Sequence, residues 1–348
     1  MAIRTLHVGL GPIGAAVARQ VAGRPGFRIA GAVDLDPAKA GRDAGTVIGL
    51  DRRLRVAVTD DLKKGIAAAS PDVVLLCTSS SLERVMPDLE RILGARKSIV
   101  STTEELAYPW HSQRRRAAAI DAWAKRARAA VLGTGVNPGF VMDALPVMLT
   151  GVCARVEGLT ITRVQDARHR RLPFQQKIGA GLTEAEFAAR VEAGSVRHVG
   201  LTESIAMIAA ALGWKLDRIT DAVAPQVASA RVTSDQLTVE AGRVCGLIQD
   251  GTGFRDGDPI IRLHMEAYLG APASYESIDI RGEPDISMSI PAGVHGDIAT
   301  ASVVVNMIPR VLAAAPGLHT MLTLPLPSWS ARPAAATAGA RGSRRPAR

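Results

Sequence analysis

The sequence is poor in cysteine. Its 348 residues contain three, Cys77, Cys153 and Cys245. They are far apart and odd in number, and no Cys-x-x-Cys or Cys/His spacing joins them. This pattern argues against a disulfide framework and a zinc site, and it predicts a reducing compartment, the cytoplasm.

Long uncharged apolar runs are also missing, although 47% of the residues are hydrophobic. The chain is therefore predicted to be a soluble globular protein without a membrane partner. No apolar segment with a small-residue cleavage site precedes the first predicted strand, so we expect no signal peptide. The histidines form neither an HExxH nor a Ser/His/Asp arrangement, which leaves hydrolase chemistry and a metal site unsupported.

Positive charge is present, but much of it lies at the C-terminus. The formal net charge is +9, and the last 18 residues, 331–348, carry five arginines and no acid. Without them the body of the chain carries only +4. This Arg/Ala/Pro-rich tail is predicted to be disordered, because its composition cannot bury a core. Nucleic acid is not an expected partner.

The length predicts more than one domain. Residues 1–136 alternate strand and helix patterns, which predicts an α/β, Rossmann-type doubly wound parallel sheet that binds a dinucleotide. The expected strands are 3–8, 27–33, 54–58, 73–78, 98–102 and 129–133, and the expected helices are 12–22, 37–45, 60–69, 82–93 and 111–127.

The pattern changes at Asn137. Residues 137–296 are predicted to form a second α+β domain on a mostly antiparallel sheet, for substrate binding and dimerisation. Its β-rich stretches are 155–166 and 228–290, interrupted by helices at about 183–193 and 200–213. A helix from Asp297 to about 314 follows, and the segment 297–327 is expected to pack back on the first domain.

Three glycines follow the first strand and open the first helix. Gly9 suits a tight turn, Gly11 lets the backbone approach a pyrophosphate, and Gly14 lets the helix pack closely on the strand. Pro12 and Ile13 lie between them at the helix N-terminus, where backbone N–H groups point at an anion. The motif alone is weak, and a glycine turn in another α/β unit remains the alternative.

The second strand ends in Asp34, twenty residues after Gly14. A carboxylate there accepts hydrogen bonds from the adenosine ribose and repels a 2′-phosphate, which favours NAD over NADP. Lys39 and Arg42 follow closely, so NADP stays possible.

Polar residues follow the fourth and fifth strands. Thr78, Ser79 and Ser80 are expected to face the coenzyme, because ligands lie beyond the carboxyl ends of such strands. Thr102 ends the fifth strand. Ser81 has the alternative role of N-cap for the next helix.

Two adjacent acids, Glu104 and Glu105, come next. They suit a substrate that carries positive charge, such as an amine or the iminium formed when it loses hydride. A carboxylate can hold the ammonium, take its proton and later activate water. The alternative is that one or both enter or cap a helix, whose first turn favours acids. Because two acids are adjacent, we expect one to bind the substrate and the other to enter or cap the helix.

Two further segments are candidates. Asn137 and Pro138 begin a turn expected to lie against the nicotinamide ring, with Phe140 over the substrate; an interdomain turn without chemistry is equally consistent. In the glycine-spaced loop 165–181, Gln176 and Lys177 are candidate substrate residues, although such a pattern is more often a surface loop.

Taken together, these segments resemble the dihydrodipicolinate-reductase-like superfamily, and within it the 2,4-diaminopentanoate dehydrogenases and native amine dehydrogenases. STTEELAYPW and the last matching segment are the most specific. The matching segments are GLGPIGAAVAR (9–19), STTEELAYPW (101–110), GVNPGF (135–140), QQKIGAG (175–181) and GVHGDIATASVVVNMIPRVLAAAPGLHTM (293–321).

The chain departs from true dihydrodipicolinate reductases, which carry a paired-histidine and lysine motif where it reads Arg168-His169-Arg170-Arg171. Reduction of the lysine-pathway intermediate is therefore not expected.

The resemblance implies a homodimer whose second domain supplies the dimer interface and part of the substrate pocket. It also implies reversible oxidative deamination of an amine to a carbonyl and ammonia with NAD or NADP. The key glutamate is assigned to Glu104 first and Glu105 second.

One alternative is a diamino acid such as 2,4-diaminopentanoate as substrate, with Arg168, Arg171 and Lys177 as candidate groups for its carboxylate. The other is a non-catalytic dinucleotide sensor.

Overall fold

A computed structural model describes residues 2–331, in two compact units. Unit 1 contains the residues up to Phe140 and those from Gly296 onward, and unit 2 contains Val141–His295. The predicted disordered tail, 331–348, lies outside the described residues except for Ala331.

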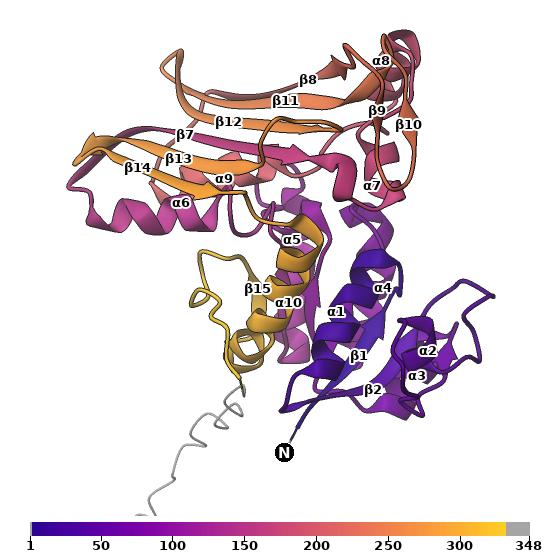
Figure 1. The fold of residues 1–348 in the computed structure, drawn as a ribbon. Helices are drawn as coiled ribbons and strands as arrows, with labels where there is room; N and C mark the ends of the chain where they lie inside the picture. The colour runs from indigo at the N-terminus through magenta and orange to yellow at the C-terminus, as the bar shows by residue number, and fades with distance from the viewer. Residues whose placement is uncertain (1, 332–348) are drawn as a thin grey trace, which may run out of the picture. The chain divides into compact units, whose positions relative to one another are not determined.

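Unit 1 is built on a seven-stranded sheet in the order β15-β6-β5-β4-β1-β2-β3, in which every pair is parallel (Figure 1). The central strand β4 is a continuous apolar run of buried residues, as is typical of a parallel sheet covered on both faces. The strands are β1 (Ile3–Val8), β2 (Phe27–Val33), β3 (Val58–Thr59), β4 (Val73–Leu76), β5 (Ser98–Ser101), β6 (Ala130–Gly133) and β15 (Gly317–His319).

Helices cover both faces of this sheet. Leu62, Leu89 and Ile120 belong to a buried cluster that packs three helices on one face. On the other face α1 and the last helix are joined by Gln20, whose amide donates to Ser302 at 2.9 Å, and by Arg24, which donates to Asn306 at 2.6 Å. The helices are α1 (Pro12–Gly23), α2 (Ala44–Val47), α3 (Leu62–Ala69), α4 (Leu82–Gly94), α5 (Arg114–Ala127) and α10 (Gly296–Ala313), with the 3₁₀ turn η1 (Glu104–Leu106).

The Rossmann-type architecture of the first part is thus confirmed. Helix α10 is also long and apolar enough to cross a membrane by length and composition. Its contacts with α1 mark it as a core helix of unit 1.

One predicted helix is largely wrong. Residues 37–41 form turns, only Ala44–Val47 is helical, and the strand expected at 54–58 is reduced to Val58–Thr59. The reason is Asp43, whose carboxylate accepts backbone N–H bonds from Gly45, Leu54, Arg55 and Val56 at 2.7–3.3 Å. These bonds organise the segment around one side chain, in place of regular backbone pairing.

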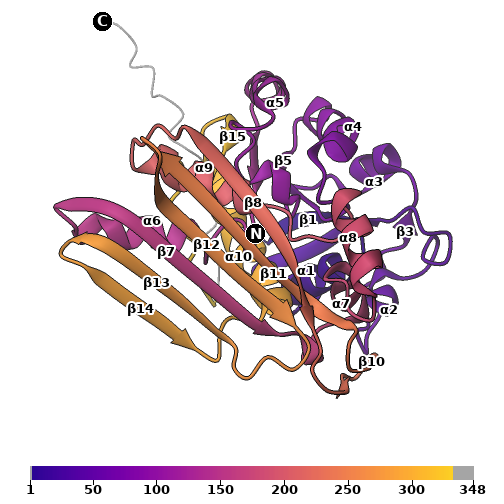
Figure 2. The same ribbon diagram turned by 90° about the horizontal axis from the view of Figure 1, so that it is seen from above.

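Unit 2 carries a six-stranded sheet in the order β14-β13-β7-β12-β11-β8, seen face-on in Figure 2. Only β7 and β12 are parallel neighbours, so the prediction of a mostly antiparallel sheet is confirmed. Its strands are β7 (Arg155–Asp166), β8 (Arg218–Val227), β11 (Val244–Arg255), β12 (Asp258–Tyr268), β13 (Tyr275–Glu283) and β14 (Ile286–Pro291); β9 (Val232–Thr233) and β10 (Thr238–Val239) form a separate pair.

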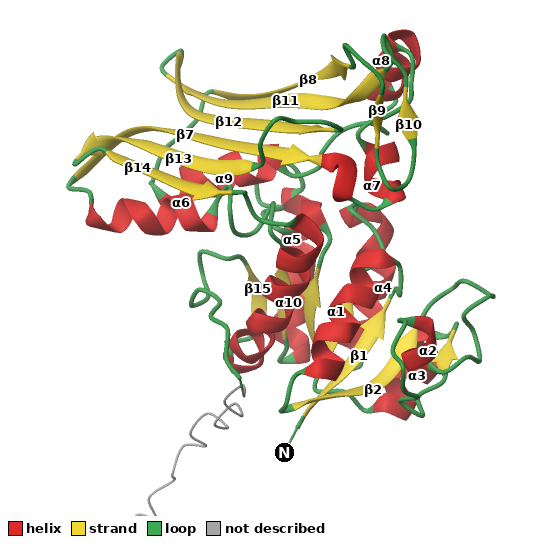
Figure 3. Ribbon diagram, viewed as in Figure 1, coloured by secondary structure: helices red, strands yellow, loops and turns green. Residues whose placement is uncertain are grey.

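Strand β8 was not expected, because Asp221 and Pro225 interrupt its apolar pattern. The helices, red in Figure 3, include α9, which packs on β8, β11 and β12. Among the described residues, no helix of unit 2 covers the opposite face of this sheet. The helices are α6 (Ala144–Leu149), α7 (Leu172–Lys177), α8 (Glu184–Glu192) and α9 (Leu201–Ala211), with 3₁₀ turns η2 (Thr150–Val152) and η3 (Ala167–His169).

Candidate active site

The candidate residues of unit 1 lie along one edge of its sheet. The strands are parallel, so their carboxyl ends meet at that edge, and the strand order reverses between β1 and β4, where such sheets bind ligands. The glycine turn follows β1 and Asp34 follows β2. Residues 78–81 follow β4, residues 102–105 follow β5, and residues 134–140 follow β6.

The three glycines have three different surroundings. Gly9 has a φ of +85°, and a Cβ there would lie 2.6 Å from the Cys77 carbonyl oxygen. A Cβ on Gly14 would lie 1.9 Å from the Gly9 carbonyl oxygen, so helix α1 packs on the turn too closely for any side chain. A Cβ on Gly11 meets nothing within 4 Å. Gly9 and Gly14 are therefore required by packing, whereas Gly11 faces open space.

This cradle fits a dinucleotide. Gly11 is the N-cap of α1, Pro12 occupies its first turn, and no acid lies there to repel a phosphate. The N–H groups of Ile13 and Gly14 belong to the first turn, which has no intrahelical acceptors for them. A pyrophosphate beside Gly11 would meet these groups and the positive end of the helix dipole.

Asp34 is held at the end of β2 by three donors. Its carboxylate accepts from the backbone N–H of Leu10 at 2.7 Å, from that of Asp36 at 2.9 Å, and from Lys39 Nζ at 3.0 Å. Burial raises the pKa of Asp34, but these hydrogen bonds and the Lys39 charge outweigh it and lower the pKa below its ordinary value. Asp34 is thus a fixed anion, with a cation beside it.

Leu35, the next residue, is 80% exposed. Sequence reasoning missed it, because an isolated leucine after a strand carries no signal. An apolar surface beside the acid predicted to bind the ribose suits the adenine ring.

The two adjacent glutamates differ in their contacts. Glu105 Oε2 accepts from the backbone N–H of Leu82, the first residue of α4, at 2.7 Å, and from Gln113 Nε2 at 2.7 Å. The Glu105 N–H donates to the Ser80 carbonyl at 3.3 Å. Ser81 occupies the N-cap position of α4 without a side-chain cap bond. Glu105 therefore caps α4 in its place.

Glu104 is half-buried and begins η1, and its carbonyl accepts from Ala107 N–H at 3.0 Å. The preceding residues fix the turn: the Ser101 hydroxyl lies 2.9 Å from the Leu76 carbonyl and 2.9 Å from the Thr103 hydroxyl. The turn is thus tied to β4 and β5, with Thr102 half-buried between its anchors.

The turn after β6 is shaped by a glycine. Gly139 has a φ of +129°, and a Cβ there would lie 2.6 Å from the Gly135 nitrogen. The Val136 N–H donates to Thr300 Oγ1 on α10 at 3.3 Å. Asn137 is 7% exposed. Sequence reasoning missed Thr300, since a contact 164 positions away leaves no local pattern.

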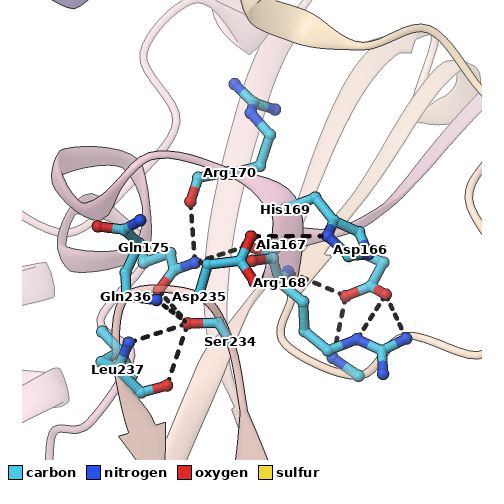
Figure 4. A network of polar contacts seen from close by, with 11 residues as sticks. Asp166, Ala167, Arg168, His169, Arg170, Gln175, Ser234, Asp235, Gln236 and Leu237 are labelled. Atoms are coloured by element: carbon cyan, nitrogen blue, oxygen red, sulfur yellow. Dashed lines mark hydrogen bonds and ion pairs between the residues drawn. The ribbon is translucent and has the colours of Figure 1, made fainter.

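In unit 2, the loop around α7 is organised by Gln175, which is fully buried. Figure 4 shows its Nε2 donating to the carbonyls of Ala167 and Arg170, each at 2.9 Å, while its Oε1 accepts from Ser234 at 2.9 Å. Gln176 and Lys177, the predicted substrate residues, follow on α7, where Gln176 is exposed and Lys177 half-buried.

Arg168, one of the candidates for a substrate carboxylate, is bound by Asp166 through Nε at 2.7 Å and Nη2 at 2.6 Å (Figure 4). Its guanidinium is committed within the loop.

All three cysteines are free thiols, and residues 2–331 contain no group of three or more His, Cys, Asp or Glu side chains that could hold a metal ion.

Comparisons with known proteins point to one family. A family model for the 2,4-diaminopentanoate dehydrogenase C-terminal domain matches residues 140–337. The chain is 33% identical to 2,4-diaminopentanoate dehydrogenase of Acetoanaerobium sticklandii over 93% of its own length and 94% of the relative's. It is 25% identical to amine dehydrogenase of Streptomyces virginiae over 93% and 96%. The structure of amine dehydrogenase from Mycobacterium smegmatis is 26% identical and superposes with a TM-score of 0.86 over 95% of this chain and 98% of that one.

Proposed function

The chain belongs to the 2,4-diaminopentanoate dehydrogenase family, and from this premise we propose that it is an NAD(P)-dependent amine dehydrogenase. The reaction is the reversible oxidation of a protonated amine, with NAD⁺ and water, to a carbonyl, ammonium, NADH and a proton. The observation that carries the mechanism is the structural role of Glu105, whose carboxylate caps α4 and accepts from Gln113. We therefore assign Glu104 to the amine.

The coenzyme-binding residues of this proposal are Gly9, Gly11, Pro12, Ile13, Gly14, Asp34, Lys39, Thr78, Ser79, Ser80, Thr102, Asn137 and Pro138. The glycine turn and the start of α1 hold the pyrophosphate, and Asp34 holds the adenosine ribose. Lys39 gives a 2′-phosphate a cationic partner, so NADP is a second coenzyme. When bound, the nicotinamide coenzyme supplies the hydride acceptor.

Glu104 has three tasks in the forward direction. It holds the substrate ammonium by a charge-assisted hydrogen bond and takes one proton from it, so that the nitrogen lone pair can drive hydride loss. It then releases this proton to solvent, and as a carboxylate again it activates water on the iminium carbon. Phe140, Gln176 and Lys177 are assigned to the substrate. These residues orient the amine-bearing carbon and exclude water.

The test mixes the protein with NAD⁺ or NADP⁺ and a panel of amines, and follows NADH or NADPH absorbance in both directions. Amine-dependent reduction supports the proposal. Coenzyme binding without turnover on any amine or carbonyl would instead favour a dinucleotide sensor.

A diamino acid is the second candidate substrate, favoured by the relative named 2,4-diaminopentanoate dehydrogenase at 33% identity. The candidates for the substrate carboxylate are Arg168, Arg171 and Lys177, and of these Arg168 is bound by Asp166. Under this candidate Arg171→Ala raises KM sharply for 2,4-diaminopentanoate and not for simple amines, and Arg168→Ala is the matched control.

We also infer a homodimer formed through the uncovered face of the unit 2 sheet. This face carries mutually satisfied charges: His264 contacts Asp250 at 2.7 Å and Glu266 at 3.0 Å. A face that pairs its own charges suits contact with a second copy. Light scattering is expected to give twice the chain mass, and Thr162→Arg on this face to give the monomer.

The three free thiols suit a reducing compartment, and we place the protein in the cytoplasm.

A further inference from the structure

The chain passes between its two units twice, after Phe140 and after His295. On the unit 2 side, each passage is close to a buried carboxylate. Asp143 follows the first passage, and Glu276 binds Val294 just before the second. Neither carboxylate has a role in the proposed chemistry.

The first anchor joins the outgoing chain to α9. Asp143 is fully buried, and its Oδ1 accepts from the Ala144 N–H at 2.6 Å. Its Oδ2 accepts from the hydroxyl of Ser204, also fully buried, at 2.7 Å. The start of unit 2 is therefore fixed to a helix that packs on its sheet.

The second anchor binds both backbone polar groups of Val294. Its N–H donates to Glu276 Oε1 at 3.1 Å. Its carbonyl accepts from Arg163 Nη2 at 2.9 Å and from Gln165 Nε2 at 3.1 Å. Val294 lies outside regular secondary structure, yet both of its backbone polar groups are hydrogen-bonded, as they would be inside a sheet. The partners are side chains.

Arg163 and Glu276 are themselves a pair. They are register partners on β7 and β13, their Nη1 and Oε1 atoms lie 2.7 Å apart, and their side chains are 2% and 0% exposed. Burying two ions is costly, and a well-packed apolar pair is often at least as stable. Fixing the geometry of Val294 is a use that an apolar pair could not serve.

A turn precedes the anchored residue. Ala292 and Gly293 have φ values of +63° and +64°, and Gly296 begins α10 two residues after Val294. On the outgoing passage Gly139 has a φ of +129°. The anchors therefore lie on the unit 2 side of each passage, and Gly139 and Gly296 lie on the unit 1 side.

We propose that Arg163, Gln165 and Glu276 are positioning residues that lock Val294 to the unit 2 sheet and so fix the point at which the chain leaves unit 2 for α10. The functional part of this inference rests on the proposed function, in which residues of unit 1 bind the coenzyme and Gln176 and Lys177 of unit 2 are assigned to the substrate. Loss of the lock should then impair turnover and leave coenzyme binding intact.

The test compares two double variants that both lack the buried ion pair. Arg163→Met with Glu276→Gln keeps an acceptor for the Val294 N–H, whereas Arg163→Met with Glu276→Met removes it. Hydrogen exchange of the peptide containing Val294, the NADH dissociation constant and kcat for amine oxidation are measured on both. In the Met/Met variant we expect exchange at Val294 at least tenfold faster and kcat at least tenfold lower than in the Met/Gln variant, with NADH affinity equal within twofold.

Equal exchange and equal kcat in the two folded variants would overturn the proposal, as would a parallel loss of NADH binding. If the Met/Met variant does not fold, Gln165→Met keeps the ion pair and removes one donor to the Val294 carbonyl, and the same readouts decide. If the wild-type protein oxidises no amine, the proposed function fails, and the exchange comparison still decides whether Val294 is locked.

Discussion

Replacing Glu105 by alanine tests the division of work between the two glutamates. The change removes the acceptor for two hydrogen bonds of 2.7 Å, one from the first residue of α4 and one from Gln113 at the start of α5. Hydrogen bonds to a charged group contribute about 1.5–3 kcal/mol each. Glu105 is only half-buried, so the lower value applies and the free energy of unfolding should fall by about 3 kcal/mol.

In a unit of this size such a loss lowers Tm by roughly 6–12 °C. Glu105→Gln keeps one acceptor oxygen and should lose about half as much. Turnover should persist in Glu105→Ala, reduced roughly tenfold to a hundredfold, because the turn that carries Glu104 is displaced. The matched variant is Glu104→Gln, which leaves both Glu105 hydrogen bonds in place.

The assay combines calorimetric unfolding with amine-dependent NADH formation on the same preparations. If Glu105→Ala is as stable as the wild type and has no turnover, while Glu104→Gln remains active, the two roles are reversed and the reasoning is refuted.

Three further predictions follow. Gly11→Ala should keep the wild-type Tm, because its Cβ enters open space, and should weaken NADH binding at least tenfold, because that space is assigned to the pyrophosphate. Gly14→Ala, with a Cβ 1.9 Å from a carbonyl oxygen, should lose about 3 kcal/mol of stability. Calorimetry and NADH fluorescence titration check both variants. Asp34→Ala should raise KM for NAD⁺ roughly tenfold and relax discrimination against NADP⁺, while Lys39→Ala should weaken NADP⁺ alone; steady-state kinetics that show no change in the NADP⁺/NAD⁺ ratio would contradict this assignment. Burial lowers the pKa of His7 from 6.5 to about 3, so the unfolded chain binds a proton that the folded one does not. Stability is therefore full above pH 6.5 and falls by about 5 kcal/mol as pH drops toward 3, and urea titrations should show that His7→Gln flattens this acid limb.

The sequence was sufficient for local features of unit 1. The apolar run before Gly9, the glycine turn and the helix after it lie within one short stretch of sequence. Local patterns in this stretch therefore predict the strand, the turn and the helix. The same is true of β4, four buried residues in a row, and of the long periodic helix α10.

Features that depend on distant contacts could not be predicted. The role of Glu105 is set by Leu82, 23 positions earlier, so nothing beside the acidic pair indicates which acid caps a helix. Asp43 reorganised a segment predicted as helix, through bonds to residues up to 13 positions away. In the loop of unit 2, neighbouring glutamines are indistinguishable by type, and only the fold shows that Gln175 is buried and Gln176 exposed.

The central claim is that Glu104 holds and deprotonates the amine. Its most direct test is amine-dependent NADH formation by the wild-type protein and by Glu104→Gln, with the NADH dissociation constant measured on both. The account predicts turnover in the wild type, a loss of roughly a thousandfold or more in the variant, and NADH affinity unchanged within about twofold. Wild-type turnover in Glu104→Gln would contradict it.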